Sequence, residues 1–296
     1  MLLSVAEDLV AAKIPATVAL CRSAMNDLSV DLPVVEANGD SAADIAAELS
    51  GAKDVTAVFP IAPECDRILT DLIRGFRNAG LKVHAPMPRA AQCFSDKWST
   101  FRFLEEHRIP SVPTYVPSQS QCHLGQSPAC VKPRDGLSCA GVQRCRSDIV
   151  QQMIAARQIS DTTHIVQPFV NGTSWSIGCI CREGEWLLLP TVQQSIDWND
   201  GLPQYKGGTV YTGTSDNADQ MEDLAQQVIA GISGFSGYLG IDFIVAATSQ
   251  NVAVMEINPR LCSSYVGYRR ATKENLMAWM LDEADTPKWC ASSVHF

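Results

Sequence analysis

The sequence predicts a mixed fold, with a leading α/β unit followed by a larger α+β region. Helical and strand-like segments alternate over about the first 90 residues, which is typical of a parallel sheet covered by helices. From about Ser95 the pattern changes to short strands and glycine turns, which is typical of antiparallel hairpins. Of the 296 residues, 46% are hydrophobic and 19% are charged, so the chain has enough apolar residues for a sizeable core.

Charge and hydropathy exclude several classes of partner. The net charge of −9 argues against nonspecific binding to nucleic acid or to anionic membranes. No uncharged apolar stretch reaches the roughly 18 residues needed to cross a bilayer, so we expect no membrane span. Glu7 and Asp8 stand where a signal peptide needs apolar residues, so we expect a cytoplasmic protein.

Eleven cysteines are scattered along the chain without any CxxC pair. A disulfide scaffold or a zinc site would show closely spaced pairs. We therefore expect reduced thiols in a reducing compartment. Cys179 and Cys181 alternate along one apolar segment, which predicts that both are core residues of a strand.

The elements of the leading unit follow from the period of the apolar residues. Helices are predicted over 2–14, 41–49 and 66–79, and strands over 16–21, 55–62 and 81–86. Such a unit usually starts with a strand, whereas this chain opens on a helix. We therefore expect the first strand to be missing or to be replaced by another segment.

The second region begins with a helix over 95–109, with Ser95 as the expected N-cap. A loop is predicted over 117–129, because this segment is rich in Ser, Gln and Pro. The remaining predicted elements are strands over 129–133, 163–170 and 205–213, a hairpin over 175–190 that turns at Glu183-Gly184, and a helix over 217–233.

The most informative segment is a predicted hairpin with strands over 240–246 and 252–258. Symmetric pairing places Asp242 opposite Glu256, and strand alternation puts Asn258 on the same face. A divalent cation such as Mg²⁺ would relieve the repulsion between two facing carboxylates, because Mg²⁺ takes carboxylate and amide oxygens. The alternative is that the acids face solvent on an edge hairpin, and the residues alone leave both open. Arg260 follows directly and can hold a phosphate or carboxylate with two hydrogen bonds.

A second candidate site lies in VKPRDGLSCAGV, residues 131–142. A strand delivers Lys132, and a turn with Gly136 and Gly141 follows. Such a turn lets backbone N–H groups approach phosphate oxygens, while the lysine supplies a positive charge. The alternative is a plain glycine turn, and the sequence has neither a GxxxxGK[ST] loop nor a GxGxxG fingerprint.

Two weaker signals also fit an anionic or planar ligand. Lys97 stands in the first turn of its helix, where a cation opposes the helix dipole. Either it serves an anionic ligand or it is an ordinary surface lysine. The strand over 163–172 bends at Pro168, which would leave backbone groups of Gln167 and Phe169 free for a planar ligand. A structural bend explains this pattern equally well.

Taken in order, five motifs resemble the ATP-grasp superfamily: SDKW, VKPRDGxxxxGV, VQPFVxG, GIDF and MEINPR. The resemblance covers roughly residues 84–280. It implies a Rossmann-like N-terminal α/β domain over 1–93, here apparently without its first strand. It further implies an ATP-grasp fold whose two α+β subdomains, over 94–166 and 167–296, grip ATP.

The same resemblance implies roles for individual residues. Those expected to contact ATP are Lys97 and Lys132 at the phosphates, the loop from Gly136 to Gly141 above them, and Gln167 and Phe169 at the adenine. Those expected to hold Mg²⁺, or Mn²⁺, are Asp242, Glu256 and Asn258. Arg260 and Lys132 are the expected catalytic residues, with Arg260 steadying an acyl phosphate.

ATP-grasp enzymes usually phosphorylate a carboxylate, and an amine then displaces the phosphate to form an amide, with ADP and phosphate as further products. The segments at 204–213 and 258–276 resemble a carboxylate–amine ligase branch that includes tyramine–glutamate ligases of methanofuran- or tetrahydromethanopterin-type cofactor synthesis. The partners implied are a small carboxylate (possible glutamate) and a tyramine-like amine, and related ligases often form homodimers. The residues implied to line the substrate cleft are Tyr205, Lys206, Gly207, Gly208, Ser264, Tyr265 and Arg269.

One departure from the family pattern concerns Gly240, which stands where D-alanine ligase-like members have an arginine. An alternative function is therefore kept beside the ligase: a non-catalytic nucleotide-binding relative with a decayed substrate site. The facing carboxylates argue against decay, since nothing else requires them. A nucleic-acid-binding protein is disfavoured by the acidic charge.

Overall fold

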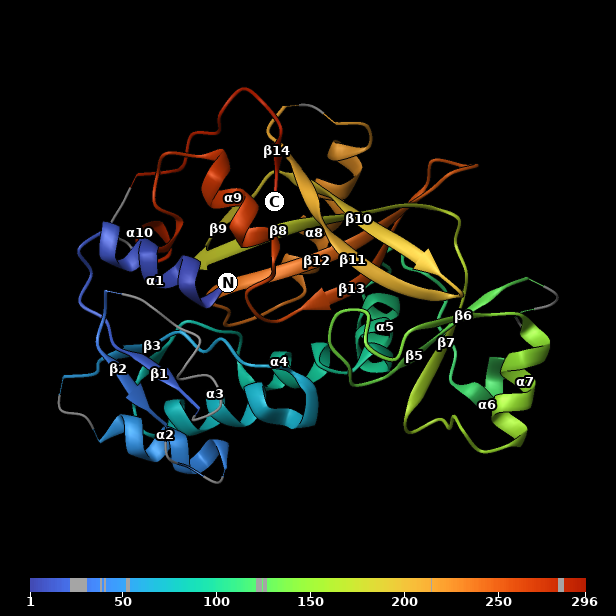
Figure 1. Ribbon diagram of the computed structural model, residues 1–296, viewed down its shortest axis with the longest axis horizontal. Coiled ribbons are helices and arrows are strands. Elements are labelled where there is room, and N and C mark those ends of the chain that lie inside the picture. Colours follow the sequence, from blue (N-terminus) through green and yellow to red (C-terminus); the bar gives the residue numbers. More distant parts are fainter. Residues whose placement is uncertain are drawn as a thin grey trace.

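A computed structural model describes residues 1–21, 31–37, 39, 41–51, 54–120, 124, 127–213, 215–281 and 285–296. A wide antiparallel sheet with helices on both faces occupies the centre, and a small sheet extends from one end (Figure 1). Short parallel strands and their helices lie at the other end. Among the described residues, no helix is long and apolar enough to span a membrane.

The N-terminal unit alternates helices and strands, as predicted. Its elements are α1 (Leu2–Ala11), β1 (Val18–Leu20), β2 (Val34–Glu36), α2 (Ala42–Ser50), β3 (Ala57–Val58), a 3-10 turn η2 (Cys65–Arg67), α3 (Ile68–Asn78), β4 (Lys82–Val83) and α4 (Pro88–Phe94). Strand β1 pairs with β2 and β3 with β4, both in parallel. In the described residues these are two separate pairs and not one sheet. The strand predicted over 55–62 is short because Pro60 and Pro63 cannot donate to a ladder.

Helix α1 spans two cores. Ala6 packs with Val18 and Leu20 of the N-terminal unit, whereas Val5 belongs to a core formed mainly by the C-terminal third of the chain. Figure 1 accordingly shows α1 beside α10 (Leu276–Met280). The first helix therefore ties the beginning of the chain to its end.

The wide sheet consists of β8 (Gly172–Arg182), β9 (Glu185–Leu188), β10 (Thr191–Asn199), β11 (Leu202–Tyr211), β12 (Gly237–Ala246), β13 (Val252–Asn258) and β14 (Val294–His295). Its order is β13-β12-β8-β10-β11-β14, with β9 on β8, and every pairing is antiparallel. The predicted turn at Glu183-Gly184 is confirmed, since both residues have positive φ, 48° and 87°.

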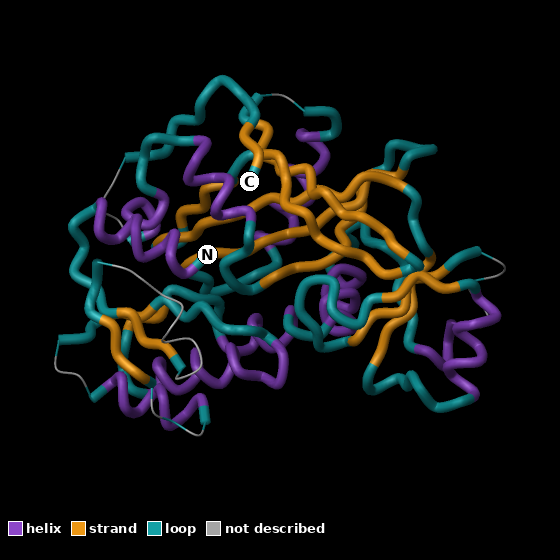
Figure 2. Tube along the Cα trace, in the orientation of Figure 1, coloured by secondary structure: helices purple, strands orange, loops and turns teal. Residues whose placement is uncertain are grey.

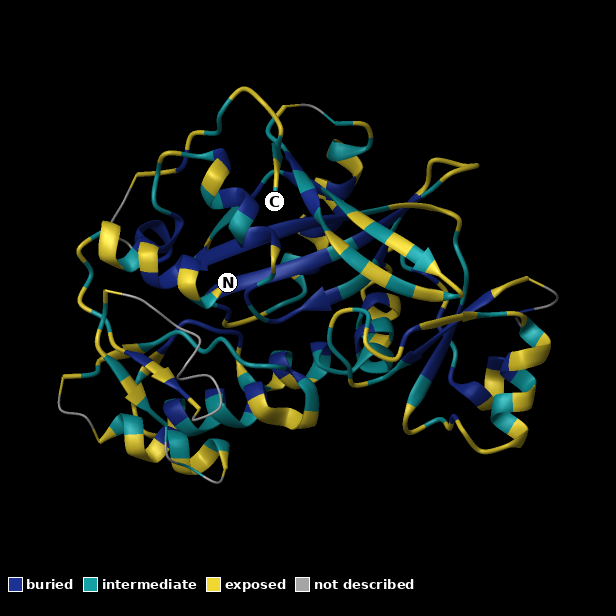
Figure 3. Ribbon diagram, viewed as in Figure 1, coloured by how far each residue is buried: buried dark blue, intermediate teal, exposed yellow. Residues whose placement is uncertain are grey.

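Strands β8 and β12 are buried on both faces, as their dark blue ribbons in Figure 3 show. One face packs against α8 (Ala218–Ala230) and α5 (Lys97–Glu106), the other against α10 and α9 (Ser264–Ala271). Cys179 and Cys181 lie in the first of these cores, as predicted. All ten cysteines described are free thiols, and Cys122 lies outside the described residues.

The small sheet has the order β6-β5-β7, with β5 (Ala129–Pro133), β6 (Gln143–Cys145) and β7 (His164–Pro168). It carries α6 (Pro117–Ser120), inside the predicted loop, and α7 (Ser147–Ala155). Figure 2 shows this sheet beside one end of the wide sheet. The predicted N-cap Ser95 is wrong: Asp96 caps α5, because its carboxylate accepts the N–H of Ser99 at 2.6 Å.

Candidate active site

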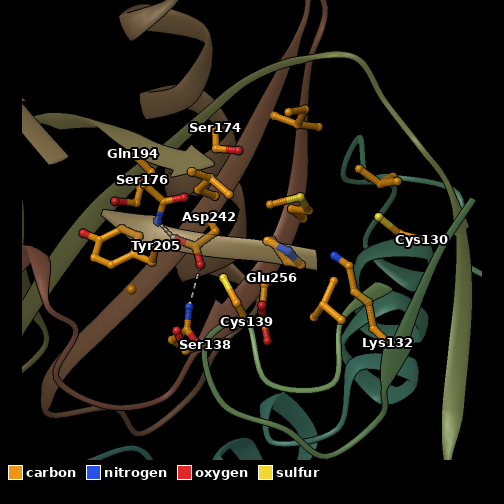
Figure 4. Close-up of a pocket in the computed structure, with 18 of the residues that line it drawn as sticks. Cys130, Lys132, Ser138, Cys139, Ser174, Ser176, Gln194, Tyr205, Asp242 and Glu256 are labelled. Atoms are coloured by element: carbon orange, nitrogen blue, oxygen red, sulfur yellow. Dashed lines mark hydrogen bonds between the residues drawn. The ribbon is translucent and has the colours of Figure 1, made fainter. Parts of the chain in front are cut away.

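A cavity of about 390 Å³ lies between the small sheet and the wide sheet. Strands β5 and β7 contribute one wall, and β8, β10, β11, β12 and β13 contribute the others. Figure 4 shows Gln194 and Tyr205 on one side of Asp242, and Lys132 beyond Glu256. The predicted residues that line it are Lys97, Lys132, Gln167, Phe169, Tyr205, Asp242, Glu256, Asn258, Arg260 and Ser264.

The two carboxylates face each other as predicted. Asp242 on β12 pairs directly with Glu256 on β13. The register then shifts, because Phe243 pairs with Val254 and leaves Met255 as an extra residue. This bulge adjoins the acidic pair, at the point where β13 borders the cavity.

Asp242 is held by two amides. Its carboxylate accepts hydrogen bonds from the Nδ2 of Asn258 at 3.0 Å and from the Nε2 of Gln194 at 3.1 Å. Burial, together with the negative charge of Glu256, raises the pKa of Asp242 to about 7. The site therefore opposes a second negative charge unless a cation shares it.

Glu256 has such a cation in Lys97. The Nζ of Lys97 lies 3.0 Å from the Glu256 carboxylate and donates to the carbonyl of Gly136 at 2.9 Å. Burial raises the pKa of Glu256, but Lys97 and Lys132 outweigh burial and hold it below its usual value. The unusual position of Lys97 in the first turn of α5 thus brings its charge to an anionic site.

The donor set suits a hard divalent cation. Two carboxylates meet here, and the amide of Asn258 donates its nitrogen to Asp242, which leaves its oxygen for another partner. In the described part of the chain, no cluster of three or more His, Cys, Asp or Glu side chains suits a metal. A cation at this site would therefore use two carboxylates and one amide.

Lys132 and the glycine turn lie at the small-sheet side of the cavity. Lys132 is buried on β5 and lines the cavity, as do Ser138 and Cys139 of the turn. Gly136 and Gly141 are not among the lining residues. Gly141 has a φ of +71°, and a Cβ there would lie 2.7 Å from Pro133, so the turn requires glycine at this position.

The bend at Pro168 is only partly as predicted. Gln167 and Phe169 line the cavity, and the Gln167 amide donates to the hydroxyl of Thr114 at 2.8 Å. The N–H of Phe169 is not free, however, because it donates to the carbonyl of Pro128 at 2.8 Å. The β5–β7 ladder continues past the proline and uses this donor.

The ring of Phe169 lies between two side chains of different elements. The guanidinium of Arg144 on β6 lies 4.0 Å from its centroid, and the ring of Trp198 on β10 meets it edge-on at 5.3 Å. Trp198 also lines the cavity. Phe169 is therefore fixed by both sheets.

Arg260 follows β13 and is paired with a residue of the N-terminal unit. Its Nε and one Nη donate to the carboxylate of Glu64, the latter at 3.0 Å, and its other Nη donates to the carbonyl of Leu261 at 3.1 Å. Burial lowers the pKa of Arg260, but the hydrogen bonds to Glu64 outweigh burial and raise it above its usual value. The guanidinium is therefore charged and held on one edge.

Of the residues implied for the substrate cleft, Tyr205 and Ser264 line the cavity. The Ser263 hydroxyl donates to the hydroxyl of Tyr205 at 3.3 Å. Ser264 shares a hydrogen bond of 3.2 Å with Tyr238. The beginning of α9 thus forms the wall beyond Arg260.

The other five lie elsewhere, which corrects their expected placement. Lys206 follows Tyr205 on β11, so strand alternation turns it to the opposite face. Gly207 and Gly208 pack against the last residue, Phe296, whose carbonyl accepts the N–H of Gly208 at 3.2 Å.

Tyr265 and Arg269 bind α1 instead of lining the cavity. The Tyr265 hydroxyl donates to Asp8 at 2.5 Å, and Arg269 donates to the same carboxylate at 2.8 and 3.0 Å. Both side chains are therefore occupied in fastening the first helix.

The departure at Gly240 has a structural reason. A Cβ at this position would lie 2.4 Å from the Sγ of Cys262. The thiol of Cys262, which lines the cavity, fills the space that an arginine would need. The cavity therefore has no cation at this point of β12.

Three polar residues that hold predicted site residues were not predicted from the sequence: Glu64, Gln194 and Thr114. Each contacts a predicted residue, respectively Arg260, Asp242 and Gln167. Glu64 follows a strand of a parallel pair, where ligand-binding residues gather in α/β folds, and this was the one available signal. The other two carry no local pattern.

Several known proteins are similar to this chain in sequence or in fold. A family model described as the ATP-grasp domain matches residues 94–264, more than half of the chain. The chain is 26% identical to phosphoribosylamine–glycine ligase of Yersinia pestis over 257 residues, which cover 77% of this chain and 58% of that enzyme. It thus spans less than two thirds of that relative's length.

Solved structures share the fold. N5-carboxyaminoimidazole synthetase of Staphylococcus aureus, complexed with ADP, has a TM-score of 0.79 at 13% identity and covers 98% of this chain and 78% of its own. Biotin carboxylase of Campylobacter jejuni has a TM-score of 0.75 at 12% identity, and the match covers 99% of this chain and 70% of that enzyme. A protein of Archaeoglobus fulgidus assigned to the ATP-grasp superfamily has a TM-score of 0.68 at 22% identity, with coverage of 94% and 79%. Because the family model matches more than half of its residues, the chain belongs to the ATP-grasp family.

Proposed function

We propose that this protein is an ATP- and Mg²⁺-dependent ligase that joins a small carboxylate to an amine, with ADP and phosphate released. One observation carries the proposal: Asp242 and Glu256 face each other in a cavity that Lys97, Lys132 and Arg260 also line. Two partly buried carboxylates among three cations suit a magnesium–polyphosphate complex. Similar proteins support it, since they include phosphoribosylamine–glycine ligase and a synthetase solved in complex with ADP.

Each charged residue of the cavity has a separate role in the proposed reaction. Bound Mg²⁺ would neutralise the phosphate oxygens and orient the terminal phosphoryl group. Lys132 and Lys97 lie at the small-sheet side, where their charges offset those of the phosphates. Arg260, beyond Asn258, would hold the carboxylate and then the acyl phosphate formed from it. An amine in the space near Tyr205 and Ser264 would then attack the acyl carbon and expel phosphate.

A non-catalytic nucleotide-binding relative is the alternative. It predicts a decayed site, whereas here the acidic pair, its two amide donors and its lysine are all in place. The pKa of Asp242, raised to about 7, shows that its negative charge is unfavourable in this site. Binding of a cation would remove this unfavourable interaction. The catalytic proposal therefore explains more of the structure.

The first test is calorimetric titration with ATP, with and without Mg²⁺, on the wild type and on Lys132→Ala. Binding that requires Mg²⁺ and weakens at least about tenfold in the variant supports the site. Folded wild type that does not bind ATP contradicts the proposal.

A second test separates the ligase from the alternative. Wild type is screened with small carboxylates and amines for release of ADP. ADP formed only when both substrates are present supports the ligase. Formation of AMP instead of ADP would contradict the proposed ligase reaction. Tight ATP binding without turnover for any pair would favour the non-catalytic relative.

Glutamate and a tyramine-like aromatic amine are the pair we propose to screen first, on the strength of the motifs at 204–213 and 258–276. We propose on the same ground that the reaction belongs to methanofuran- or tetrahydromethanopterin-type cofactor synthesis. We also propose a cytoplasmic homodimer. The free thiols support the location. The assembly is supported by a fold neighbour, the biotin carboxylase domain of the Hydrogenobacter thermophilus 2-oxoglutarate carboxylase, which is described as a dimer.

A further inference from the structure

Glu64 is a buried acid at the boundary between the N-terminal unit and the cavity. Its side chain is 4% exposed and comes from the segment that joins β3 to α3. Within the described residues, its carboxylate is hydrogen bonded to Arg260 alone. Because a buried carboxylate is unfavourable without a partner, this pairing is the reason the acid can lie here.

The pairing leaves part of Arg260 available. A guanidinium has five N–H donors. Two of them bind Glu64 and one binds the carbonyl of Leu261. Two donors therefore remain for a ligand in the cavity that Arg260 lines. Glu64 and Leu261 hold the guanidinium and do not saturate it.

The backbone after Glu64 is held in an unusual conformation. Asp66 and Arg67 have φ values of 52° and 62°, which non-glycine residues rarely adopt in succession. The N–H of Asp66 donates to the carboxylate of Asp135 at 2.9 Å, next to the glycine turn. One short segment therefore contacts both Arg260 and the start of the glycine turn.

We propose that Glu64 is a positioning residue that aims the guanidinium of Arg260 at the acyl-phosphate end of the cavity. The inference rests on the proposed function, in which Arg260 steadies that group. A long, flexible arginine side chain samples many rotamers, and a two-point partner selects one of them before the substrate arrives. The N-terminal unit thereby supplies part of the active site without touching the substrate.

The test uses the reverse half-reaction, with acetyl phosphate and MgADP as probes. The phosphoryl group moves from the acetyl oxygen to the terminal phosphate of ADP, which yields ATP and acetate. Glu64→Gln is expected to lower kcat at least about tenfold and to leave the KM for MgADP within about twofold, because Glu64 acts only on Arg260. In an Arg260→Lys background, the same change is expected to have less than about a twofold further effect.

The matched control is Glu7→Gln. It removes another glutamate–arginine contact between distant segments, with Arg269 at 2.6 Å, and neither residue lines the cavity. This control is expected to keep the wild-type rate. Wild-type kcat in Glu64→Gln, or losses that multiply in the double variant, would overturn the proposal.

A second measurement needs no turnover. The Nε–H signal of Arg260 is followed by NMR in arginine-labelled protein and is assigned with Arg260→Lys. We expect a signal protected from solvent exchange in the wild type and rapid exchange in Glu64→Gln. Equal exchange in both proteins overturns the positioning role. Failure of the wild type to bind MgADP would instead remove the proposed function, and the NMR result would still decide whether Glu64 holds Arg260.

Discussion

The N–H of Arg144 donates to the carbonyl of Gly201 at 2.7 Å, and this bond joins the tip of the β10–β11 hairpin to the edge of the small sheet. The hairpin thus reaches from the wide sheet to the small sheet, and its residues Trp198 and Pro203 line the cavity. It also brings Trp198 against Phe169. The contact at the hairpin tip therefore connects the two sheets beside the cavity.

Gly201→Ala is expected to disrupt this contact. Gly201 has a φ of +79°, and a Cβ would lie 2.6 Å from the carbonyl oxygen of Arg144. The left-handed backbone costs alanine about 1–2 kcal/mol, and the clash adds about 1–3 kcal/mol. Urea denaturation should show both losses, and the affinity for MgATP should fall because Trp198 shifts.

Gly184→Ala is the matched control, since Gly184 also lies in a hairpin turn with a φ of +87° but has open space around it. It should lose only the backbone part, about 1–2 kcal/mol, and keep the affinity for MgATP. Equal losses in the two variants would show that the tip contact contributes nothing.

Glu256→Gln is expected to abolish the effect of Mg²⁺ on ATP binding and to lower turnover about 10²–10³-fold. The amide keeps the shape of the side chain but removes the charge that Asp242 and Lys97 face. Calorimetry with and without Mg²⁺ checks the first effect, and release of ADP checks the second.

The control for that variant is Glu185→Gln, which changes a glutamate that is 61% exposed. It should behave as the wild type in both assays. Unchanged Mg²⁺ dependence in Glu256→Gln would refute the cation site.

Asp8→Ala is expected to destabilise the fold by about 3 kcal/mol, because it leaves the hydroxyl of Tyr265 and the guanidinium of Arg269 without their buried partner. Glu7→Ala is the control: Glu7 also binds Arg269, but its side chain is 50% exposed against 10% for Asp8. It should cost less than about 1 kcal/mol. Denaturation of both variants compares them, and similar losses would argue against a buried anchor for α1.

His84 is expected to make the fold sensitive to acid. Burial, and then the charge of Lys82, lowers the pKa of His84 from 6.5 to about 4, and its Nδ1 has no hydrogen-bond partner among the described residues. Between these values the unfolded chain binds more protons than the folded chain, so stability falls as the pH falls from 6.5 toward 4. The upper limit is about 3 kcal/mol.

The measurement is the midpoint of urea denaturation at pH 7 and at pH 5. His84→Gln should flatten the difference between them, and His107→Gln, which changes an exposed histidine, should keep it. If His84→Gln kept the wild-type difference between the midpoints at pH 7 and pH 5, the acid sensitivity would belong to other groups.

Local patterns in the sequence were sufficient for much of the site. The facing of Asp242 and Glu256 follows from two apolar strands and a short loop, because a hairpin register is set within a few residues. Period and turn residues likewise predicted α1, α2, α3, α5, α8 and the Glu183-Gly184 turn, but not the helices α4, α6, α7, α9 and α10. The order of five motifs led to the family that the domain match shows.

The sequence could not reveal which distant side chains meet. Glu64 and Arg260 are 196 residues apart, and Asp8 and Tyr265 are 257 apart. Tyr265 and Arg269 follow the motif that carries Arg260, yet the packing of α1 turns them away from the cavity. Proximity along the chain therefore misplaced them.

The sequence by itself thus determined most of the longer elements, the paired carboxylates and the kinds of residue available for phosphate chemistry. Only the tertiary structure decided the partner of each buried charge: Glu64 for Arg260, Lys97 for Glu256 and Asp8 for Arg269. The physical reason is that periodicity specifies which face of an element is buried. A buried charge, however, takes whichever opposite charge the packing of remote elements brings within hydrogen-bond distance.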